Sequence, residues 1–96
     1  MARLTITAHA RADLYEIHSY IAKDNPKAAG HFVKRLRFKA RQLAETPGMG
    51  RSRAEDLRPG LLSFPVGQYI IFYCEQPDGI VLIRIIHGSR DLNTLF

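Results

Sequence analysis

The chain has 96 residues, enough for one hydrophobic core, so we expect a single domain over residues 1–96 without room for a large cofactor cavity. A single cysteine, Cys74, excludes an intrachain disulfide, and the lack of an apolar run long enough for a signal peptide or a membrane span predicts a cytoplasmic protein. A net charge of +5, concentrated between Lys27 and Gly60, favours an acidic partner, either nucleic acid or an acidic protein segment.

The first part of the chain predicts a strand followed by a helix. Residues 3–7 alternate polar and apolar side chains, as a short strand does. The period then changes, and apolar residues recur at helical spacing at Ala10, Leu14, Ile17 and Ile21. Asp24-Asn25-Pro26 ends this helix and begins a second one, with Asn25 as its N-cap and Pro26 in its first position.

The second helix is expected to run to about Thr46. One face is apolar, and a basic stripe on the far side contains Lys27, Lys34, Arg37 and Arg41. This stripe is either a solvated face or a binding surface. Phe38 lies near the stripe on the helical wheel, and we expect its ring to widen the buried face rather than to form an exposed contact.

After a basic loop at residues 51–53 the period becomes two. Three strands are predicted, at residues 61–64, 68–75 and 80–87. Residues 76–79 supply the turn between the last two strands, whereas Pro65 and Gly67 break the chain between the first two. A turn or short helix follows at residues 90–95. The order β-α-α-β-β-β predicts an α+β fold, with a helical hairpin packed on a small, mainly antiparallel sheet.

The last two predicted strands are apolar on both faces, in the runs 69–73 and 80–86. A helical hairpin covers only one face of a sheet. The second face therefore requires a binding partner, the C-terminal segment, or both.

Motifs for metal, nucleotide or acyl-transfer chemistry are missing. No metal-binding spacing is found among the possible ligands, which are His9, His18, His31, His87 and Cys74. Gly48-Met49-Gly50 follows a helix and lacks the Lys-Ser/Thr of a phosphate-binding loop, and no nucleophile elbow is present. We therefore expect neither a metal nor a cofactor.

Candidate chemistry is confined to the end of the last strand, where Arg84, His87, Arg90 and Asp91 occur together. RNA cleavage needs a group that moves a proton from the 2′-hydroxyl, such as histidine, and a cation that stabilises the phosphate. Glu55 is a further candidate base, although nothing in the sequence places it near His87. The alternatives are a binding role, or an exposed Arg90–Asp91 pair that caps a final helix.

Short motifs follow one another along nearly the whole chain. In the two helices they are Asp13-Leu14, Ile17, Tyr20-Ile21-Ala22, Asp24-Asn25-Pro26, Ala28-Ala29, Phe32, Leu36, Leu43-Ala44 and Pro47. In the loop and strand that follow they are Gly50-Arg51-Ser52-Arg53, Leu57-Arg58-Pro59-Gly60-Leu61, Ser63, Pro65-Val66-Gly67 and Tyr69. The last is Ile86-His87-Gly88-Ser89-Arg90-Asp91-Leu92. In this order the motifs resemble the ParE branch of the ParE/RelE toxin superfamily.

The resemblance implies the toxin of a type II toxin–antitoxin pair, neutralised by a ParD-like antitoxin whose acidic, partly apolar C-terminal segment wraps over it. ParE-like members inhibit DNA gyrase by binding, and RelE-like members cut messenger RNA on the ribosome. RelE-like nucleases usually place an Arg before the central strand and a Tyr near the C-terminus. This chain has Gln68-Tyr69 at the first position and no Tyr after His87. A gyrase inhibitor that is not an enzyme is therefore favoured over a ribosome-dependent endoribonuclease.

Two sets of contact residues are expected from this reading. The candidates for contact with the target are Arg58, Arg84, His87 and Arg90. The candidates for contact with the antitoxin are Lys34, Arg37, Phe38 and Arg41. A third hypothesis is an inactive or purely structural binding module.

Overall fold

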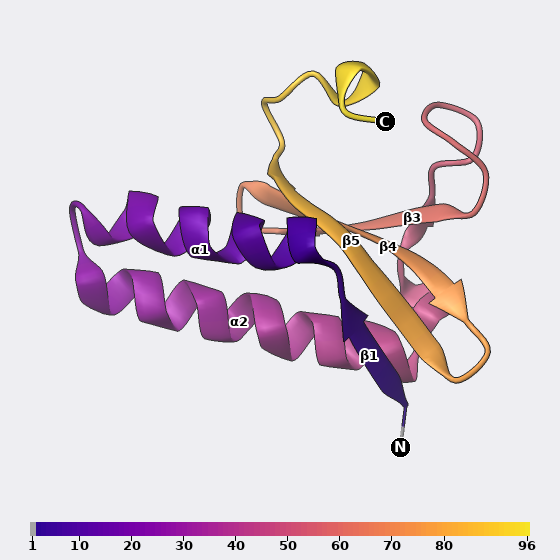
Figure 1. Cartoon of the computed structure of the whole chain (residues 1–96), viewed down its shortest axis with the longest axis horizontal. Helices are drawn as coiled ribbons and strands as arrows, with labels where there is room; N and C mark the ends of the chain where they lie inside the picture. Colours follow the sequence, from indigo (N-terminus) through magenta and orange to yellow (C-terminus); the bar gives the residue numbers. More distant parts are fainter. Residues whose placement is uncertain (1) are drawn as a thin grey trace.

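The computed structural model describes residues 2–96, in which two helices pack on a five-stranded mixed sheet (Figure 1). In chain order the elements are β1 (Arg3–Ile6), α1 (Ala8–Ala22), α2 (Pro26–Glu45), the 3-10 helix η1 (Pro47–Met49), β2 (Arg51–Ser52), β3 (Leu61–Val66), β4 (Tyr69–Gln76), β5 (Gly79–His87) and the 3-10 helix η2 (Leu92–Thr94). The predicted α+β fold is confirmed, with β2 as an additional short strand. Within the described residues, no helix combines the length and the apolar character needed to cross a membrane.

Both helices begin at side chains that cap their first turn. Thr7 Oγ1 accepts a hydrogen bond from the Ala10 N–H at 3.1 Å, and α1 begins directly after it. The same hydroxyl donates to the Ile83 carbonyl at 2.9 Å, which ties the start of α1 to the sheet. Asn25 Oδ1 accepts from the Ala28 N–H at 3.1 Å, so the predicted cap of α2 is confirmed.

The sheet has the strand order β1-β5-β4-β3-β2, which places the first strand of the chain beside the last. β1 and β5 are parallel, from Arg3 opposite Gly79 to Ile6 opposite Leu82. The other neighbouring strands are antiparallel. A Cβ atom at Gly79 would overlap the backbone of Arg3, so this close pairing requires glycine.

The predicted break after Phe64 is wrong, because β3 continues through Pro65 to Val66. Residues Arg51–Ser52 form the edge strand β2 rather than a loop, and β2 pairs with β3 only as far as Ser63. Beyond that point the outer edge of β3 has no neighbouring strand among residues 2–96. A proline is tolerated in such an edge strand because its missing N–H costs no hydrogen bond on the open side.

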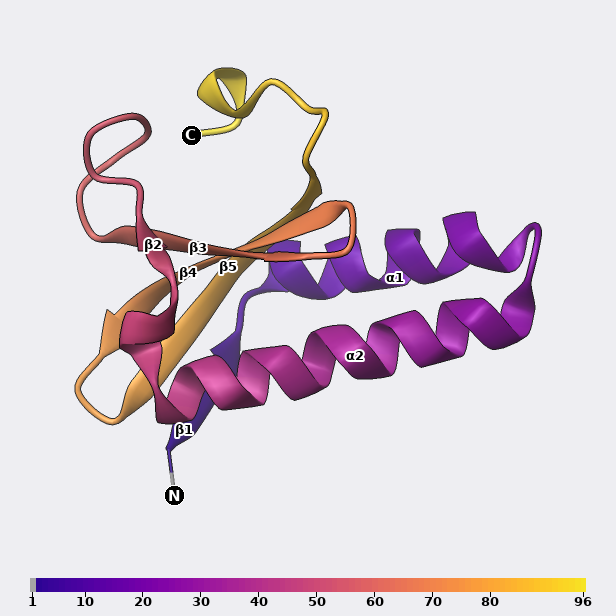
Figure 2. The same ribbon diagram turned by 180° about the vertical axis from the view of Figure 1, so that it is seen from behind.

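The helical hairpin covers one face of the sheet, as predicted (Figure 2). The buried residues of this core are Ala10, Leu14, Ile17, Leu36, Ala40, Leu43, Ala44, Val66, Ile71, Tyr73, Ile80, Leu82 and Ile85. The Tyr73 hydroxyl, which lies at the edge of this core, donates to the Pro47 carbonyl at 2.6 Å. Phe38 does not join the core and is 65% exposed, because it is two residues, about 200°, from both Leu36 and Ala40 on the helix.

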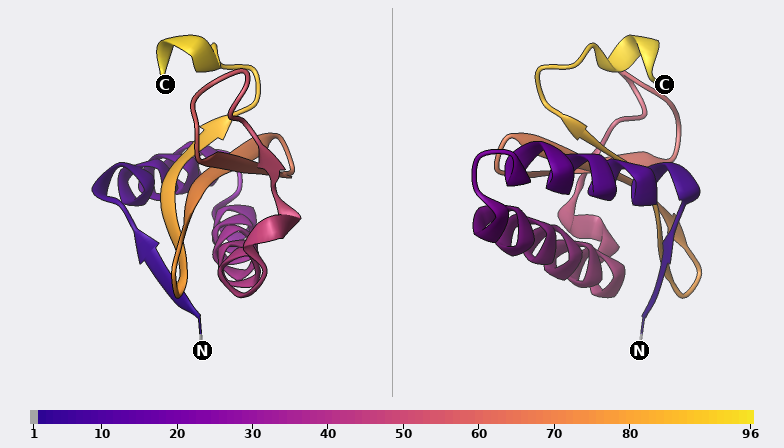
Figure 3. Two further views of the ribbon diagram at one scale, coloured as in Figure 1. Left: turned by 90° about the vertical axis from the view of Figure 1, so that its right-hand side faces the viewer. Right: turned by 60° about the vertical axis from the view of Figure 1, so that its left-hand side comes forward.

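The C-terminal segment covers part of the opposite face (Figure 3). Its apolar side chains, from Leu92, Leu95 and Phe96, pack around the buried residues Leu61, Phe72 and Ile86. The ring centroids of Phe96 and Phe72 are 4.8 Å apart, and the Arg58 guanidinium lies 5.4 Å from the centroid of the Phe96 ring. The C-terminal segment was one of the coverings predicted for this face, and the structure shows it packed there.

Candidate functional site

The candidate site lies where α1 runs beside the last residues of β5 (Figure 1). β1 pairs with β5 only as far as Leu82, and Asp13 of α1 bonds to the edge beyond it. The Asp13 carboxylate accepts from the Ile85 N–H at 2.9 Å and from Arg84 Nε and Nη2 at 2.8 and 3.0 Å. Asp13 therefore provides a hydrogen-bond partner for a backbone N–H at the part of the β5 edge that β1 does not reach.

Arg84 is held by this carboxylate rather than projecting freely. The register of β4 and β5 shifts between Phe72 and Tyr73, so β5 contains an extra residue, and a bulge of this kind redirects the side chains beside it. The side chains of Arg84 and Asp13 are only 21% and 10% exposed. The hydrogen bonds to Asp13 raise the pKa of Arg84 above its ordinary value. Arg84 is thus an anchor that joins β5 to α1.

The sequence indicated Arg84 but not Asp13. Asp13 lies three residues after Ala10 and four before Ile17, on the apolar stripe of α1. A carboxylate on such a stripe is a signal for a buried cationic partner. The partner is 71 residues away in the chain, however, and no local pattern identifies it.

His87, the last residue of β5, has partners at both ring nitrogens. Nδ1 accepts from the Ser89 backbone N–H at 3.1 Å and lies 2.8 Å from Ser89 Oγ. Nε2 lies 3.3 Å from Gln68 Oε1, which accepts only from a protonated nitrogen. The neutral tautomer with hydrogen on Nε2 satisfies all these contacts. The ring also packs edge-on against Tyr69, with centroids 5.1 Å apart, so its orientation is fixed.

Three of the four candidates for target contact share one cleft. Arg84, His87 and Arg90 line a space of about 190 Å³ between α1 and the end of β5, together with Glu16 and Tyr20 of α1. Arg90 is exposed, and its backbone N–H donates to the His87 carbonyl at 3.0 Å. The tight turn after β5 thus places a solvent-facing arginine beside the histidine.

The fourth candidate, Arg58, lies elsewhere. Arg58 and Glu55 belong to the loop between β2 and β3, which packs through Leu57 on the face covered by the C-terminal segment. His87 lines the spaces on the helix side, and no hydrogen bond or ion pair within residues 2–96 joins it to Glu55. The structure does not bring these two groups together as an acid–base pair.

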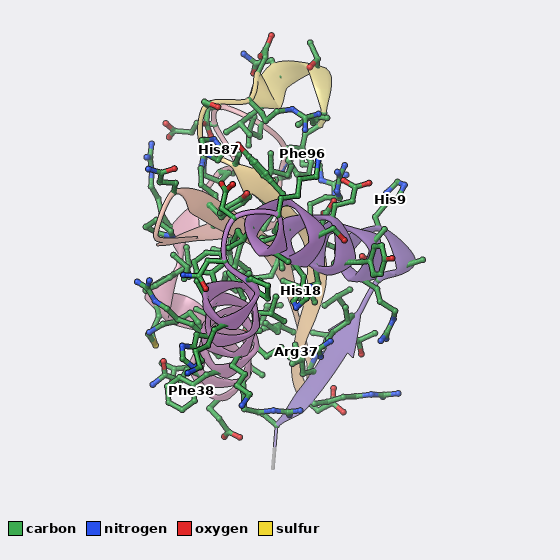
Figure 4. The ribbon with its side chains drawn as sticks, turned by 90° about the vertical axis from the view of Figure 1, so that its left-hand side faces the viewer. His9, His18, Arg37, Phe38, His87 and Phe96 are labelled. Atoms are coloured by element: carbon green, nitrogen blue, oxygen red, sulfur yellow. The ribbon has the colours of Figure 1, made fainter. Side chains whose placement is uncertain are left out.

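Two of the four candidates for antitoxin contact line a groove between β1, α1 and α2, and the other two lie outside it. Its volume is about 300 Å³, and its apolar lining consists of Leu4, Ile6, Leu14, Leu36, Ala40, Leu82 and Ile85. Arg37 and Arg41 supply its charged side chains. Figure 4 shows Arg37 extending toward β1 and Phe38 pointing away on the other side of α2. Lys34 and Phe38 are exposed outside the groove.

The histidines do not form a metal site with one another. Figure 4 shows His9, His18 and His87 far apart on α1 and at the end of β5. Across residues 2–96, no group of three His, Cys, Asp or Glu side chains is arranged to hold a metal ion. Cys74, a free thiol, is partly buried on the face beneath the C-terminal segment.

Residues 4–92 match the family described as ParE toxin of type II toxin-antitoxin system, parDE. The chain belongs to the ParE toxin family. "Toxin RelE2" of Caulobacter vibrioides is 38% identical to it, over 94% of this chain and 99% of the relative. "Toxin ParE3" of the same organism is 30% identical, over 96% of this chain and 92% of the relative. A solved chain titled "Chromosomal ParDE TA system from P. aeruginosa" has the same fold, with a TM-score of 0.77 at 22% identity over 93% of this chain and 98% of the other.

Membership of the ParE family makes this chain a toxin of a type II toxin–antitoxin system. Its relatives carry both ParE and RelE names at similar coverage. The choice between the activities expected of the two branches therefore depends on the groups at the end of β5.

Proposed function

We propose that this ParE-family toxin inhibits DNA gyrase by binding to it, without catalysing a reaction. The main support is the arrangement around Arg84 and His87, because Arg84 Nε and Nη2 and both ring nitrogens of His87 already have partners inside the protein. General acid–base catalysis needs a group that is free to take and return a proton on the substrate. Arg90, in contrast, presents its charge to solvent at the mouth of the cleft. An exposed arginine on a rigid support suits recognition of a protein surface.

Supercoiling of a plasmid by purified gyrase tests this proposal. We expect the toxin to abolish supercoiling in a dose-dependent manner, and Arg90→Ala to weaken inhibition at least about tenfold, which corresponds to about 1.4 kcal/mol. Arg51→Ala, which removes an exposed arginine from β2, is the matched control and should inhibit normally. Full inhibition by the Arg90→Ala toxin would remove this residue from the contact, and no inhibition by the wild-type chain would end the gyrase proposal.

The second candidate function is cleavage of messenger RNA on the ribosome. It is favoured by the shared cleft of His87 and Arg90 and by the RelE name of a 38% identical relative. In a translation extract, this activity predicts new 5′ ends in the transcript that appear with the wild-type chain and are lost with His87→Ala. Intact transcripts at a toxin concentration that blocks supercoiling would exclude it.

For the partner, we infer a ParD-like antitoxin with an acidic, partly apolar segment that lies in the groove between β1, α1 and α2. The groove combines an apolar lining with Arg37 and Arg41, and in residues 2–96 the outer edge of β1 has no strand beside it. The double variant Arg37→Glu/Arg41→Glu should weaken antitoxin binding at least about tenfold. Lys27→Glu on the same helix, outside the groove, is the control. Equal affinity of both variants would place the antitoxin elsewhere.

A further inference from the structure

A separate and larger pocket lies at the tip of the helical hairpin. Its volume is about 690 Å³, and it is formed by the end of α1, the α1–α2 turn, Phe32 of α2, the β3–β4 turn and the end of β5. The helical hairpin extends past the β3–β4 turn (Figures 1 and 2), and the side chain of Phe32 on α2 lies close to Gly67 of that turn. The pocket adjoins the cleft of Arg90, because Tyr20, Tyr69 and His87 line both.

Aromatic rings form the walls of this pocket. The Tyr69 ring lies between Phe32, at a centroid distance of 5.5 Å, and His87, at 5.1 Å. Tyr20, which is 63% exposed, stands at the opening. The β3–β4 turn is fixed close to Phe32, since Gly67 has a φ of +59° and a Cβ atom there would lie 3.2 Å from the Phe32 ring. The walls are thus preformed rather than assembled by a ligand.

The charge of the pocket is opposite to that of the whole chain. The chain carries a net charge of +5, yet the pocket has no Lys or Arg in its lining and one carboxylate, that of Asp24. Within residues 2–96, the Asp24 side chain makes no ion pair and no hydrogen bond. The adjoining cleft has two carboxylates, Asp13 and Glu16, and two arginines, Arg84 and Arg90, so the negative charge is confined to the pocket itself. A solvent-exposed carboxylate that has no partner within residues 2–96 is therefore placed next to aromatic faces.

These features select among possible occupants. A phosphate or an acidic peptide is repelled by Asp24, and an aliphatic side chain would desolvate the carboxylate without pairing it. A cation satisfies Asp24 and is attracted by the aromatic faces. A guanidinium group is flat, weakly hydrated and able to bond to a carboxylate with two parallel N–H groups, so it fits better than an ammonium.

We propose that this pocket binds an arginine side chain of the toxin's protein target. The proposal rests on the proposed function, in which the target is a protein. It extends the contact surface from the exposed Arg90 to the tip of the hairpin. In this arrangement Arg90 of the toxin contacts the target at one point, and the pocket containing Asp24 binds an arginine of the target at another.

The pocket itself is tested with N-acetyl-arginine amide as the probe, titrated into the ¹⁵N-labelled toxin. A single pair of this kind binds in the millimolar range, which is on the order of 4 kcal/mol. We expect saturable shifts of the backbone amides of Asp24, Gln68 and Tyr69. The citrulline analogue, equal in shape but uncharged, should give at least about tenfold weaker binding. Equal binding of both analogues, stronger binding of the lysine analogue, or no saturation with arginine overturns the proposal.

Two variants connect the pocket to activity. Asp24→Asn keeps the shape and removes the charge, and it should abolish the probe shifts and weaken gyrase inhibition at least about tenfold. Glu75→Gln removes an exposed carboxylate of β4 outside the pocket and should change neither. Antitoxin affinity and the unfolding midpoint, measured for both variants, report whether the fold is retained.

The two proposals fail in different ways. If the wild-type chain binds the probe but does not inhibit gyrase, the proposed target is wrong and the arginine pocket stands. If the wild-type chain inhibits gyrase and Asp24→Asn inhibits equally well, the target stands and the pocket has no part in recognising it. Phe32→Leu, which removes one aromatic wall, should weaken probe binding in the same direction as Asp24→Asn, and unchanged binding would refute the role of the aromatic walls.

Discussion

The face of the sheet under the helices and the face under the C-terminal segment are covered in different ways. Two long helices bury a continuous core on the first face, in which Leu43 and Tyr73 are fully buried. On the second face, a short segment after β5 packs on a smaller cluster around Phe72, and its own side chains stay partly exposed. Because stability follows buried apolar area, the first face carries most of the fold and the second has a cover of lower stability.

The largest effect is expected on the helix-covered face. Leu82→Ala removes a side chain that is 1% exposed on the strand between β1 and β4, and it should lower the free energy of unfolding by about 2–5 kcal/mol. Urea unfolding followed by circular dichroism measures this loss. Leu95→Ala on the C-terminal segment is the matched control, and an equal loss there would contradict the unequal roles of the two faces.

A smaller effect is expected where α1 joins β5. Asp13→Asn keeps an acceptor for the Ile85 N–H but leaves Arg84 without its counter-charge, so we expect a loss of about 2–3 kcal/mol. Adding Arg84→Met should recover part of this loss, because the uncompensated charge is removed. Unfolding midpoints of the two variants provide the comparison, and no recovery in the double variant would show that the ion pair is not the cause.

Loosening the C-terminal segment on the second face should leave the rest of the fold intact. Phe96→Ala removes the ring that stacks against Phe72 and Arg58, and we expect a loss of about 1 kcal/mol, because Phe96 is partly exposed at a chain end. Binding of the dye ANS should increase while the far-UV spectrum stays the same. A collapse of the far-UV signal would mean that this segment holds the whole sheet together.

The smallest effect, absent at neutral pH, concerns Tyr73 on the helix-covered face. Burial is the main cause that raises the pKa of Tyr73 above its ordinary value of 10.0, so the folded state favours the neutral phenol. Stability is therefore unaffected below that value and falls as the pH rises from it through the raised pKa. Tyr73→Phe should remove this part of the alkaline decline, and an unchanged pH profile would show that Tyr73 does not titrate with unfolding.

The local parts of the fold were predictable from the sequence. The helical period and the Asn25 cap define the hairpin, and the apolar run 69–73 with the turn residues 76–79 after it indicates β4, because each signal is contained in a few neighbouring residues. The Asp13–Arg84 pair was not predictable, since its partners are distant in the chain and meet only in the folded state. The pocket around Asp24 was missed for the same reason, because its lining comes from separate segments.

The pairing of β1 with β5 has a consequence for synthesis of the chain. Arg3 lies opposite Gly79, and the groove between β1, α1 and α2 is lined both by Leu4 near the start and by Ile85 near the end. Contacts of such long sequence separation form late, because a large loop must close before they are made. A growing chain on the ribosome therefore has neither the completed sheet nor the groove until β5 has emerged. If the antitoxin binds in this groove as proposed, it can do so only after that point in translation.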